Sequence, residues 1–460
     1  MSDARHGGQP DLLRSLGSWG AASIVVGTII GSGIFLVPKT MINAVGSPLL
    51  VLVVFLVGGL LSLAGALTYA ELGAALPQAG GEYVYLREAY GPFAAFLYGW
   101  TQFFVAKSGS IAALGTAFFY YLANFWPALQ EPMFTIPLVV GESALTVSLG
   151  QVFAIVLIFF LGWVNYLGVK VGGGVQTAVT ALKIVLILTI VLLAALLGGG
   201  STENLQSTVE HTGGVTGFFA ALVAALWAYD GWNNLTMVSS EVREPQKNIP
   251  RSLIHGVMGV MAIYALTNVA YFYCLSAAEV AVSDRVASDA ARGFLGEGGR
   301  DAVAIAAMIS IFAALNGSIL SGARVPYAMA RDGYFFAGAG RVHSRHRTPH
   351  VAILALSLWG AVLVLTGSFE ELFNYVIFAS YLLYALTAAS VFVLRRKLPD
   401  LERPYRTLGY PWVPSLFIVL ASALVLATLI HSPRESMRGL GLIALGIPFY
   451  WRWRRSALAK

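Results

Sequence analysis

Hydrophobic residues fall into long runs along the whole 460-residue chain, and short polar segments separate these runs. A helix needs about 20 consecutive apolar residues to cross a bilayer, and each run is long enough to do so. The runs lie near residues 18–38, 48–75, 92–123, 148–167, 174–198, 214–240, 251–275, 300–330, 350–367, 371–394, 412–430 and 437–455. The pattern predicts an all-α integral membrane protein with twelve transmembrane helices in one membrane domain.

Composition and charge support this prediction and orient the chain. Hydrophobic residues make up 57% of the sequence and charged residues 11%, whereas soluble domains carry roughly 25% charged residues. The net charge of +6 does not indicate a nucleic-acid partner, because the basic residues lie in short loops between apolar runs. Most of the 29 lysines and arginines fall in alternate loops on the side of the N-terminus. By the positive-inside rule, this asymmetry places both termini in the cytoplasm.

The first apolar run is interrupted near its middle by Gly31, Ser32 and Gly33. A helix broken at bilayer depth is tolerated only where it lines a polar cavity or is covered by protein. Such a break ends one half-helix and frees backbone N–H groups at the start of the next, which suits a small anion such as a carboxylate. The alternative is that the small residues only let a second helix pack closely.

A second interruption lies in the sixth run, at residues 227–234, with the sequence WAYDGWNN. Acidic and amide side chains at a helix centre are costly in lipid and normally face a cavity. Asp230-Gly231 predicts a break and a restart. Asp230 is placed to cap the second half-helix, or else to add negative charge near the substrate ammonium or to pair with a cation. Two broken helices at matching positions of two halves are typical of an inverted-repeat transporter with a site at the midplane.

The two breaks together favour an amino acid as the ligand. The first break offers N–H donors to a carboxylate, and the end of the half-helix around Trp227 and Ala228 offers unpaired carbonyl groups to an ammonium. This inference depends on the chemistry of the two breaks alone.

The chain resembles the amino-acid–polyamine–organocation superfamily, and within it the L-type amino-acid transporters (light-subunit-like) and their bacterial serine/threonine- and alanine-exchanging relatives. The resemblance runs from about residue 15 to 392. Its motifs are GTIIGSGIF at 27–35, AGALTYAELG at 64–73, AGGEYVYLREAYG at 79–91, VQTAVTALK at 175–183, WAYDGWNN at 227–234, EVREPQKNIP at 241–250 and ALNGSILSGAR at 314–324.

This resemblance implies a LeuT-like fold with a five-plus-five inverted repeat and discontinuous helices 1 and 6. The expected divisions are a cytoplasmic segment at 1–17, repeats at 18–198 and 214–394, and two further helices with a cytoplasmic tail at 395–460. It also implies a set of substrate-binding positions: Ile29, Gly31, Ser32, Gly33, Trp227, Ala228, Asp230 and Asn233. In the family pattern, backbone at the Gly-Ser-Gly break meets the carboxylate, carbonyls at 29, 227, 228 and 230 meet the ammonium, and the aromatic at 227 gates the site.

The sequence departs from the family pattern at three places. Position 230 is glycine in many animal members, and Trp227 replaces a frequent phenylalanine, which favours a smaller substrate. The loop near 124–147 lacks the cysteine that attaches a glycoprotein partner to animal light subunits. We therefore expect no covalent heavy-subunit partner.

Lys183 is the most informative charge within a predicted span. In sodium-coupled relatives of the fold a cation lies between spans 1 and 8, and in the family that this chain resembles, a lysine of span 5 occupies that place. Lys183 lies about ten residues into its span, too deep to reach the interface easily. Two coupling modes remain open: obligatory exchange with Lys183 always charged, or proton symport with Lys183 titrating. Lys107, in span 3, is expected to be structural or to lie near the cytoplasmic side of the pocket, without direct contact with the substrate.

A group of charges lies at predicted cytoplasmic helix ends, where ion pairs can close an inner gate or merely anchor the helices. The group comprises Glu71, Glu82, Arg87, Glu241, Arg243, Arg324 and Arg331. We take Trp227, Glu241 and Arg324 as the gate candidates.

The sequence thus predicts a sodium-independent antiporter of small neutral L-amino acids that works by alternating access in the cell inner membrane. The alternative is a proton-coupled symporter in which Lys183 titrates. No HExxH motif or carboxylate dyad within the spans indicates an enzyme, and paired broken helices argue against a channel. No metal or cofactor is expected. The single cysteine, Cys274, leaves neither an intrachain disulfide nor a thiolate metal cluster.

Overall fold

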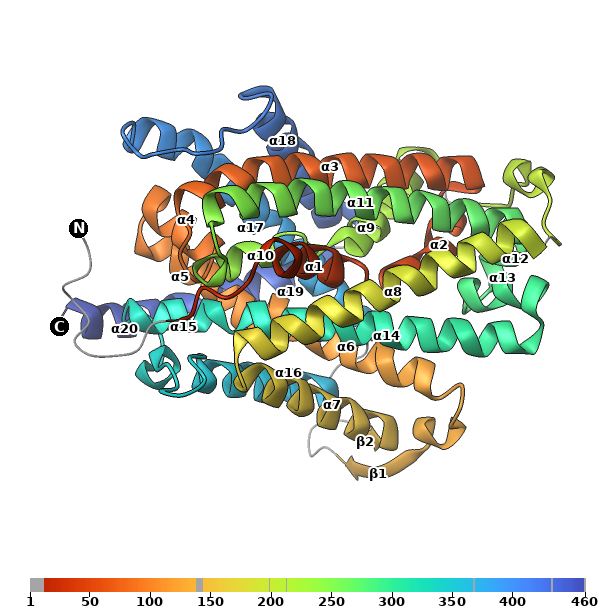
Figure 1. The fold of residues 1–460 in the computed structure, drawn as a ribbon, viewed down its shortest axis with the longest axis horizontal. Coiled ribbons are helices and arrows are strands. Elements are labelled where there is room, and N and C mark those ends of the chain that lie inside the picture. Colours follow the sequence, from red (N-terminus) through yellow and green to blue (C-terminus); the bar gives the residue numbers. More distant parts are fainter. Residues whose placement is uncertain are drawn as a thin grey trace.

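A computed structural model describes residues 12–137, 144–197, 199–211, 213–366, 369–431 and 433–458. The first eleven residues of the predicted cytoplasmic segment 1–17 lie outside this part of the chain. The described chain is almost entirely helical, as the apolar runs predict (Figure 1).

The helices follow one another in a single series. They are α1 (Ser18–Ile29), α2 (Gly33–Val45), α3 (Pro48–Ala75), α4 (Glu82–Tyr90), α5 (Pro92–Thr101), α6 (Lys107–Leu122), α7 (Leu149–Tyr166), α8 (Val169–Leu197), α9 (Gly214–Tyr229), α10 (Asn234–Met237), α11 (Pro245–Cys274), α12 (Ala277–Val282), α13 (Val286–Leu295), α14 (Glu297–Gly322), α15 (Arg324–Arg331), α16 (His350–Thr366), α17 (Phe369–Lys397), α18 (Trp412–His431), α19 (Pro433–Ala444) and α20 (Gly446–Leu458). Shorter elements are the π-helical turn η1 (Gln102–Ala106), the 3-10 helices η2 (Pro127–Gln130), η3 (Thr202–Gln206), η4 (Ser239–Glu241) and η5 (Ala337–Gly340), and strands β1 (Pro132–Pro137) and β2 (Ala144–Ser148).

Eight helical segments of the described chain are long and apolar enough to cross a membrane. They are Ser18–Val45, Pro48–Ala75, Pro92–Leu122, Leu149–Tyr166, Val169–Leu197, Pro245–Cys274, Glu297–Arg331 and Trp412–Ile430. Two shorter apolar helices, Gly214–Tyr229 and His350–Leu365, match the sixth and ninth predicted runs. The structure therefore supports a multi-pass helical membrane protein, while the full set of twelve spans and the inverted repeat remain predictions.

The long helices form a bundle whose centre is the pair α1 and α2. These two helices together with α14 and α15 are mostly buried, whereas α8 and α18 are mostly uncovered. The outer face of α8 presents large apolar side chains such as Leu188, Leu192 and Leu196. Exposed apolar side chains over the length of a helix suit contact with lipid. Helix α11 lies along α3 at the outside of the same bundle (Figure 1).

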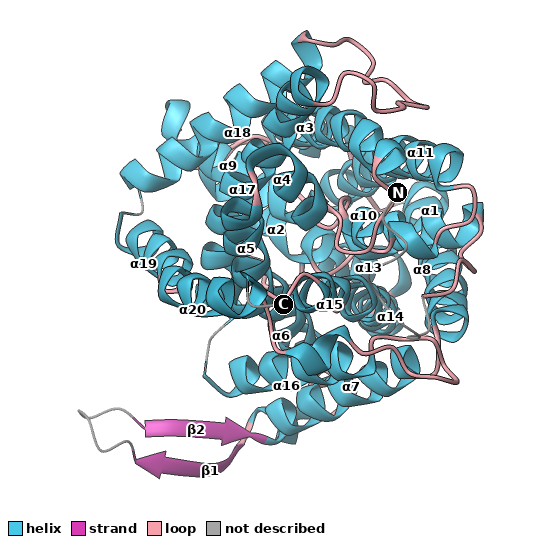
Figure 2. Cartoon of the chain, turned by 90° about the vertical axis from the view of Figure 1, so that its left-hand side faces the viewer, coloured by secondary structure: helices cyan, strands magenta, loops and turns pink. Residues whose placement is uncertain are grey.

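Two details differ from the predicted pattern. The apolar run at 437–455 does not form one uninterrupted helix, because Leu445 separates α19 from α20 and these helices have 12 and 13 residues. The loop near 124–147 contains an antiparallel hairpin of β1 and β2, which projects away from the bundle (Figure 2).

Candidate functional site

The predicted break in the first span is present between α1 and α2. Helix α1 ends at Ile29, and α2 begins at Gly33. Among the described residues, no protein group accepts a hydrogen bond from the backbone N–H groups of Gly31, Ser32 and Gly33. Unpaired donors at the start of a helix attract negative charge. The break therefore has the chemistry of a carboxylate cradle.

The second predicted break separates α9 from α10 and lies directly against the first. Gly231 has a φ of +105°, and its carbonyl oxygen lies 2.8 Å from Thr28 Oγ1, whose single proton is shared with the Ile24 carbonyl oxygen at 2.6 Å. At Gly33, an added Cβ would lie 2.7 Å from the Ala228 Cα, so only glycine permits this approach of α2 to α9. The two broken segments thus hold each other in place.

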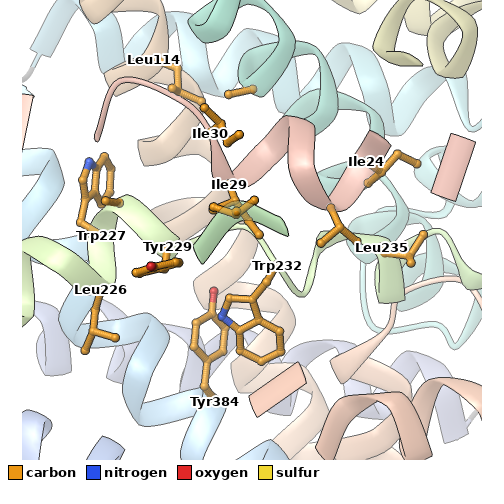
Figure 3. Packing of buried hydrophobic residues seen from close by; sticks show 14 of the residues in the cluster. Ile24, Ile29, Ile30, Leu114, Leu226, Trp227, Tyr229, Trp232, Leu235 and Tyr384 are labelled. Carbon is orange, nitrogen blue, oxygen red and sulfur yellow. The ribbon is translucent and has the colours of Figure 1, made fainter. Parts of the chain in front are cut away.

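A cavity lies between the two breaks. Its lining residues come from α1, α2, α6, the segment around the end of α9, and α14: Thr28, Ile29, Gly31, Ser32, Gly33, Lys107, Ser110, Leu114, Trp227, Asp230, Gly231, Asn234 and Ser318. Six of the eight predicted substrate-binding residues are in this set, and Ala228 and Asn233 are not. Ile29, Leu114 and Trp227 surround the same space (Figure 3).

Tyr264 of α11 connects the two breaks, a contact that the sequence does not signal. Its hydroxyl lies 3.0 Å from the Ile29 carbonyl oxygen and 2.8 Å from the Ala228 carbonyl oxygen. These are two of the carbonyls that the resemblance assigns to a substrate ammonium. The hydroxyl carries one proton, so it donates to one carbonyl at a time and leaves lone pairs on both.

Lys183 lies at the first break, as predicted. Its ammonium donates to the carbonyl oxygens of Gly27 at 2.7 Å and Ile30 at 2.5 Å, and the side chain is fully buried. The Ser310 hydroxyl of α14 donates to the same Ile30 oxygen at 2.9 Å. A cation from α8 and a hydroxyl from α14 therefore meet at the unwound backbone of the first span.

Lys107, expected to be structural or near the pocket, lies at the cavity. It lines the cavity and donates to Asn234 Oδ1 at 2.6 Å. Asp230 was predicted to cap the restarting half-helix, but α10 has no side-chain cap, and Asp230 Oδ1 instead accepts from the Tyr384 hydroxyl at 2.9 Å. Tyr384 packs against Trp232 on the side of the break away from the cavity (Figure 3). Regular apolar helices supply these partners, so no local sequence signal marks them.

Asn233 faces away from the cavity and contacts Glu82. The Asn233 side-chain amide donates to Glu82 Oε1, and the Thr236 hydroxyl lies 3.2 Å from Glu82 Oε2. All three side chains are fully buried. The two neighbouring asparagines of the second break thus have different partners. Asn234 lines the cavity and contacts Lys107, whereas Asn233 contacts Glu82 of α4.

The gate candidates Glu241 and Arg324 form a bidentate ion pair with distances of 2.7 and 2.9 Å, and neither side chain is exposed. The neighbouring Arg87 pairs with Asp332 at 2.6 Å. The backbone carbonyl of Glu241 accepts from the N–H groups of Ser15 and Leu16, which ties the start of the described chain to this pair.

The site has the groups needed to bind a zwitterion, namely N–H donors, carbonyl acceptors and buried charges of both signs. Among the described residues, no group of three or more His, Cys, Asp or Glu side chains has an arrangement that could hold a metal ion.

Comparison with known proteins identifies the family. The family model described as amino acid permease matches residues 16–450. The serine/threonine exchanger SteT of Bacillus subtilis (strain 168) is 33% identical over 447 residues, which cover 96% of this chain and 98% of that protein. The b(0,+)-type amino acid transporter 1 of Homo sapiens is 33% identical over 444 residues, covering 96% and 88%. The human cystine/glutamate transporter is 31% identical over 431 residues, covering 93% and 83%.

These matches confirm the resemblance that the motifs indicate. The chain belongs to the amino acid permease family.

Proposed function

We propose that the protein is a sodium-independent antiporter that exchanges small neutral L-amino acids by alternating access. The similar proteins of known name include a serine/threonine exchanger and amino-acid transporters, which supports an amino-acid antiporter rather than an enzyme. The large Trp227 side chain at the cavity favours small substrates.

In this proposal the free N–H groups of Gly31, Ser32 and Gly33 bind the substrate carboxylate. The carbonyls of Ile29, Trp227, Ala228 and Asp230 bind the ammonium. The position of Ile29 and Asp230 on the cavity supports this assignment. The Ile29 and Ala228 carbonyls also face the Tyr264 hydroxyl, which leaves each a second lone pair for the substrate.

The observation that carries the proposal of sodium independence is the position of Lys183. Its ammonium donates to two carbonyls of the unwound first span, and Ser310 of α14 reaches one of them. A sodium ion held between these helices needs the same oxygens. We infer that the lysine supplies the positive charge at this place and leaves no vacancy for a metal ion.

The gates and the orientation complete the proposal. Trp227 closes over the substrate, and the Glu241–Arg324 pair closes the end of the pathway near the chain termini. We further propose two repeats at 18–198 and 214–394, an inner-membrane location with both termini in the cytoplasm, and no covalent heavy subunit.

The test is uptake of labelled alanine or serine into proteoliposomes in sodium-free buffer. Vesicles contain or lack unlabelled amino acid, and an inward proton gradient is present or absent. Uptake that requires internal amino acid and ignores the gradient supports exchange. Uptake into empty vesicles that follows the gradient refutes exchange in favour of proton symport, a candidate supported by the contact of Lys183 with neutral carbonyls. Absence of saturable uptake refutes the substrate class.

A further inference from the structure

Helix α4 is fastened to α10, the short second half of the broken sixth span. The Gly80 N–H donates to the Met237 carbonyl at 2.9 Å. Gly81 has a φ of +54°, and an added Cβ there would lie 2.9 Å from the Thr236 carbonyl carbon. Glu82 follows directly as the first residue of α4 and is fully buried at this junction.

The contact between Thr236 and Glu82 is one proton short if the carboxyl group of Glu82 is ionised. The Thr236 hydroxyl lies 2.7 Å from the Asn233 carbonyl oxygen and 3.2 Å from Glu82 Oε2. A hydroxyl has a single proton to donate, and the shorter contact takes it. A protonated Glu82 supplies the missing hydrogen, because its O–H then donates to Thr236 Oγ1 while Thr236 donates to the Asn233 carbonyl.

The charges around Glu82 agree with a neutral carboxyl group. Among the described residues it forms no ion pair, unlike Glu71 and Glu241. Lys107, a cation that interacts electrostatically with Glu82, is hydrogen-bonded to Asn234 and also interacts with Asp230. The other ionisable groups facing Glu82 come from α3, α4, α5 and α17 and are the tyrosines Tyr69, Tyr85, Tyr98 and Tyr384.

The α15 helix also contacts α4, but its Arg324 is paired with Glu241, and Asp332 beyond its end is paired with Arg87. Burial raises the pKa of the Glu82 carboxyl group above its ordinary value, although hydrogen bonds from the Asn233 amide, the Glu82 backbone N–H and the Tyr98 hydroxyl, and the charge of Lys107, act in the opposite direction. An unpaired buried carboxylate is costly, and neutralisation by a proton removes that cost.

We propose that Glu82 binds a proton while α4 and α10 are docked and releases it to water when they separate. The step moves one proton between the carboxylate and water and needs no other reactant. Glu82 is therefore a proton-binding site distinct from Lys183 and from the substrate cavity. Its consequence for transport rests on the proposed exchange function, whereas its protonation does not.

The sign of the pH dependence follows from this binding. The docked state holds the proton more tightly than the separated state, in which water solvates the carboxylate. Docking is therefore most favourable below the pKa of the solvated group, and this contribution is lost as pH rises toward the pKa of the buried group. Between these two values the docking equilibrium changes up to tenfold per pH unit.

Infrared difference spectroscopy of the reconstituted full-length protein tests the protonation directly. We expect a C=O stretching band of a protonated carboxyl group at neutral pH, which disappears in Glu82→Gln. Thr236→Val removes the acceptor of the Glu82 proton and shifts this band to higher frequency, and the matched Thr236→Ser leaves it in place. A neutral-pH spectrum from which Glu82→Gln removes no such band overturns the proposal, whether or not the protein transports.

Exchange of labelled serine, measured from acidic to alkaline pH, tests the consequence. The exchange rate of the wild type should vary with pH as expected for the titration of a single group. This pH dependence should be absent in Glu82→Gln. If the infrared band is lost in Glu82→Gln but no exchange occurs at any pH, the exchange function fails and the proton site stands. If exchange occurs and both proteins have the same pH profile, the coupling of this site to transport is refuted.

Discussion

Replacing Lys183 should separate the stability of the protein from its transport. The ammonium makes two charge-assisted hydrogen bonds to carbonyls of the first break, and each is worth about 1.5–3 kcal/mol. Lys183→Met keeps the length of the side chain and removes both, a loss of about 3–6 kcal/mol. Removing a buried charge also removes a desolvation cost of several kcal/mol. The two effects nearly cancel in the free energy of unfolding.

The local geometry of the first break does not benefit from the lower desolvation cost. Without the ammonium, the Gly27 carbonyl loses the partner described here, and the Ile30 carbonyl keeps its contact with Ser310. An unpaired buried carbonyl costs about 1–3 kcal/mol, which is a factor of about 5–150 in the population of the productive break. We expect the thermal midpoint of Lys183→Met in detergent to stay close to that of the wild type. Exchange in proteoliposomes should fall by a factor of about 5–150.

A second variant distinguishes charge from packing. Lys183→Ala removes the charge and leaves space beside the same carbonyl oxygens and the Ser310 hydroxyl, which are ligands suited to sodium. Sodium, but not the same concentration of choline, should partly restore exchange in Lys183→Ala and have no effect on the wild type. Exchange by Lys183→Met at the wild-type rate would refute the role of the ammonium. If Lys183→Ala exchanges at the same rate in sodium and in choline, the idea that the Lys183 ammonium takes the place of a bound sodium ion is refuted.

Three further substitutions have defined outcomes. Glu241→Gln breaks a fully buried ion pair and leaves Arg324 charged without its partner. The free energy of unfolding should therefore fall by about 3–5 kcal/mol, and an unchanged melting midpoint contradicts this. Gly33→Ala should abolish exchange because its Cβ has no space, whereas Gly259→Ala, with open space around it, should exchange normally. Tyr264→Phe should lower the free energy of unfolding by about 1–3 kcal/mol and change the KM for serine in exchange assays. An unaltered KM argues against the Ile29 and Ala228 carbonyls, which the Tyr264 hydroxyl contacts, as the ammonium site.

The sequence pattern was sufficient to locate the two breaks and to show that Lys183 lies deep within a span, and the family resemblance placed this lysine at the first break. Glycines at mid-depth in the first span and an aspartate in the sixth are unfavourable in a regular lipid-facing helix, so their presence alone indicates an unusual backbone. Lys183 was detectable for the same reason, because a charge far from the interface requires polar partners. These features are local, and a local pattern can reveal them.

The partners of the site could not be found in this way. Tyr264 and Ser310 lie in α11 and α14, whose sequences are typical of ordinary membrane helices. Their role depends on which face of the helix meets the breaks, and this is decided by the packing of helices distant in sequence. The interruption of the twelfth predicted run was missed for a related reason, because hydropathy does not reveal the separation of α19 from α20 at Leu445.

The two adjacent asparagines of the second break show why this limit matters for mechanism. Successive residues of a helix point about 100° apart, so Asn233 and Asn234 have different partners: Glu82 for one and Lys107 for the other. Lys107 lines the cavity, whereas Glu82 lies at the junction of α4 and α10. A displacement of α10 large enough to separate Asn233 from Glu82 must also move Asn234, and so it changes the polar lining of the cavity. The state of the α4 junction and the shape of the substrate site are therefore linked through one short helix, without any longer chain of contacts.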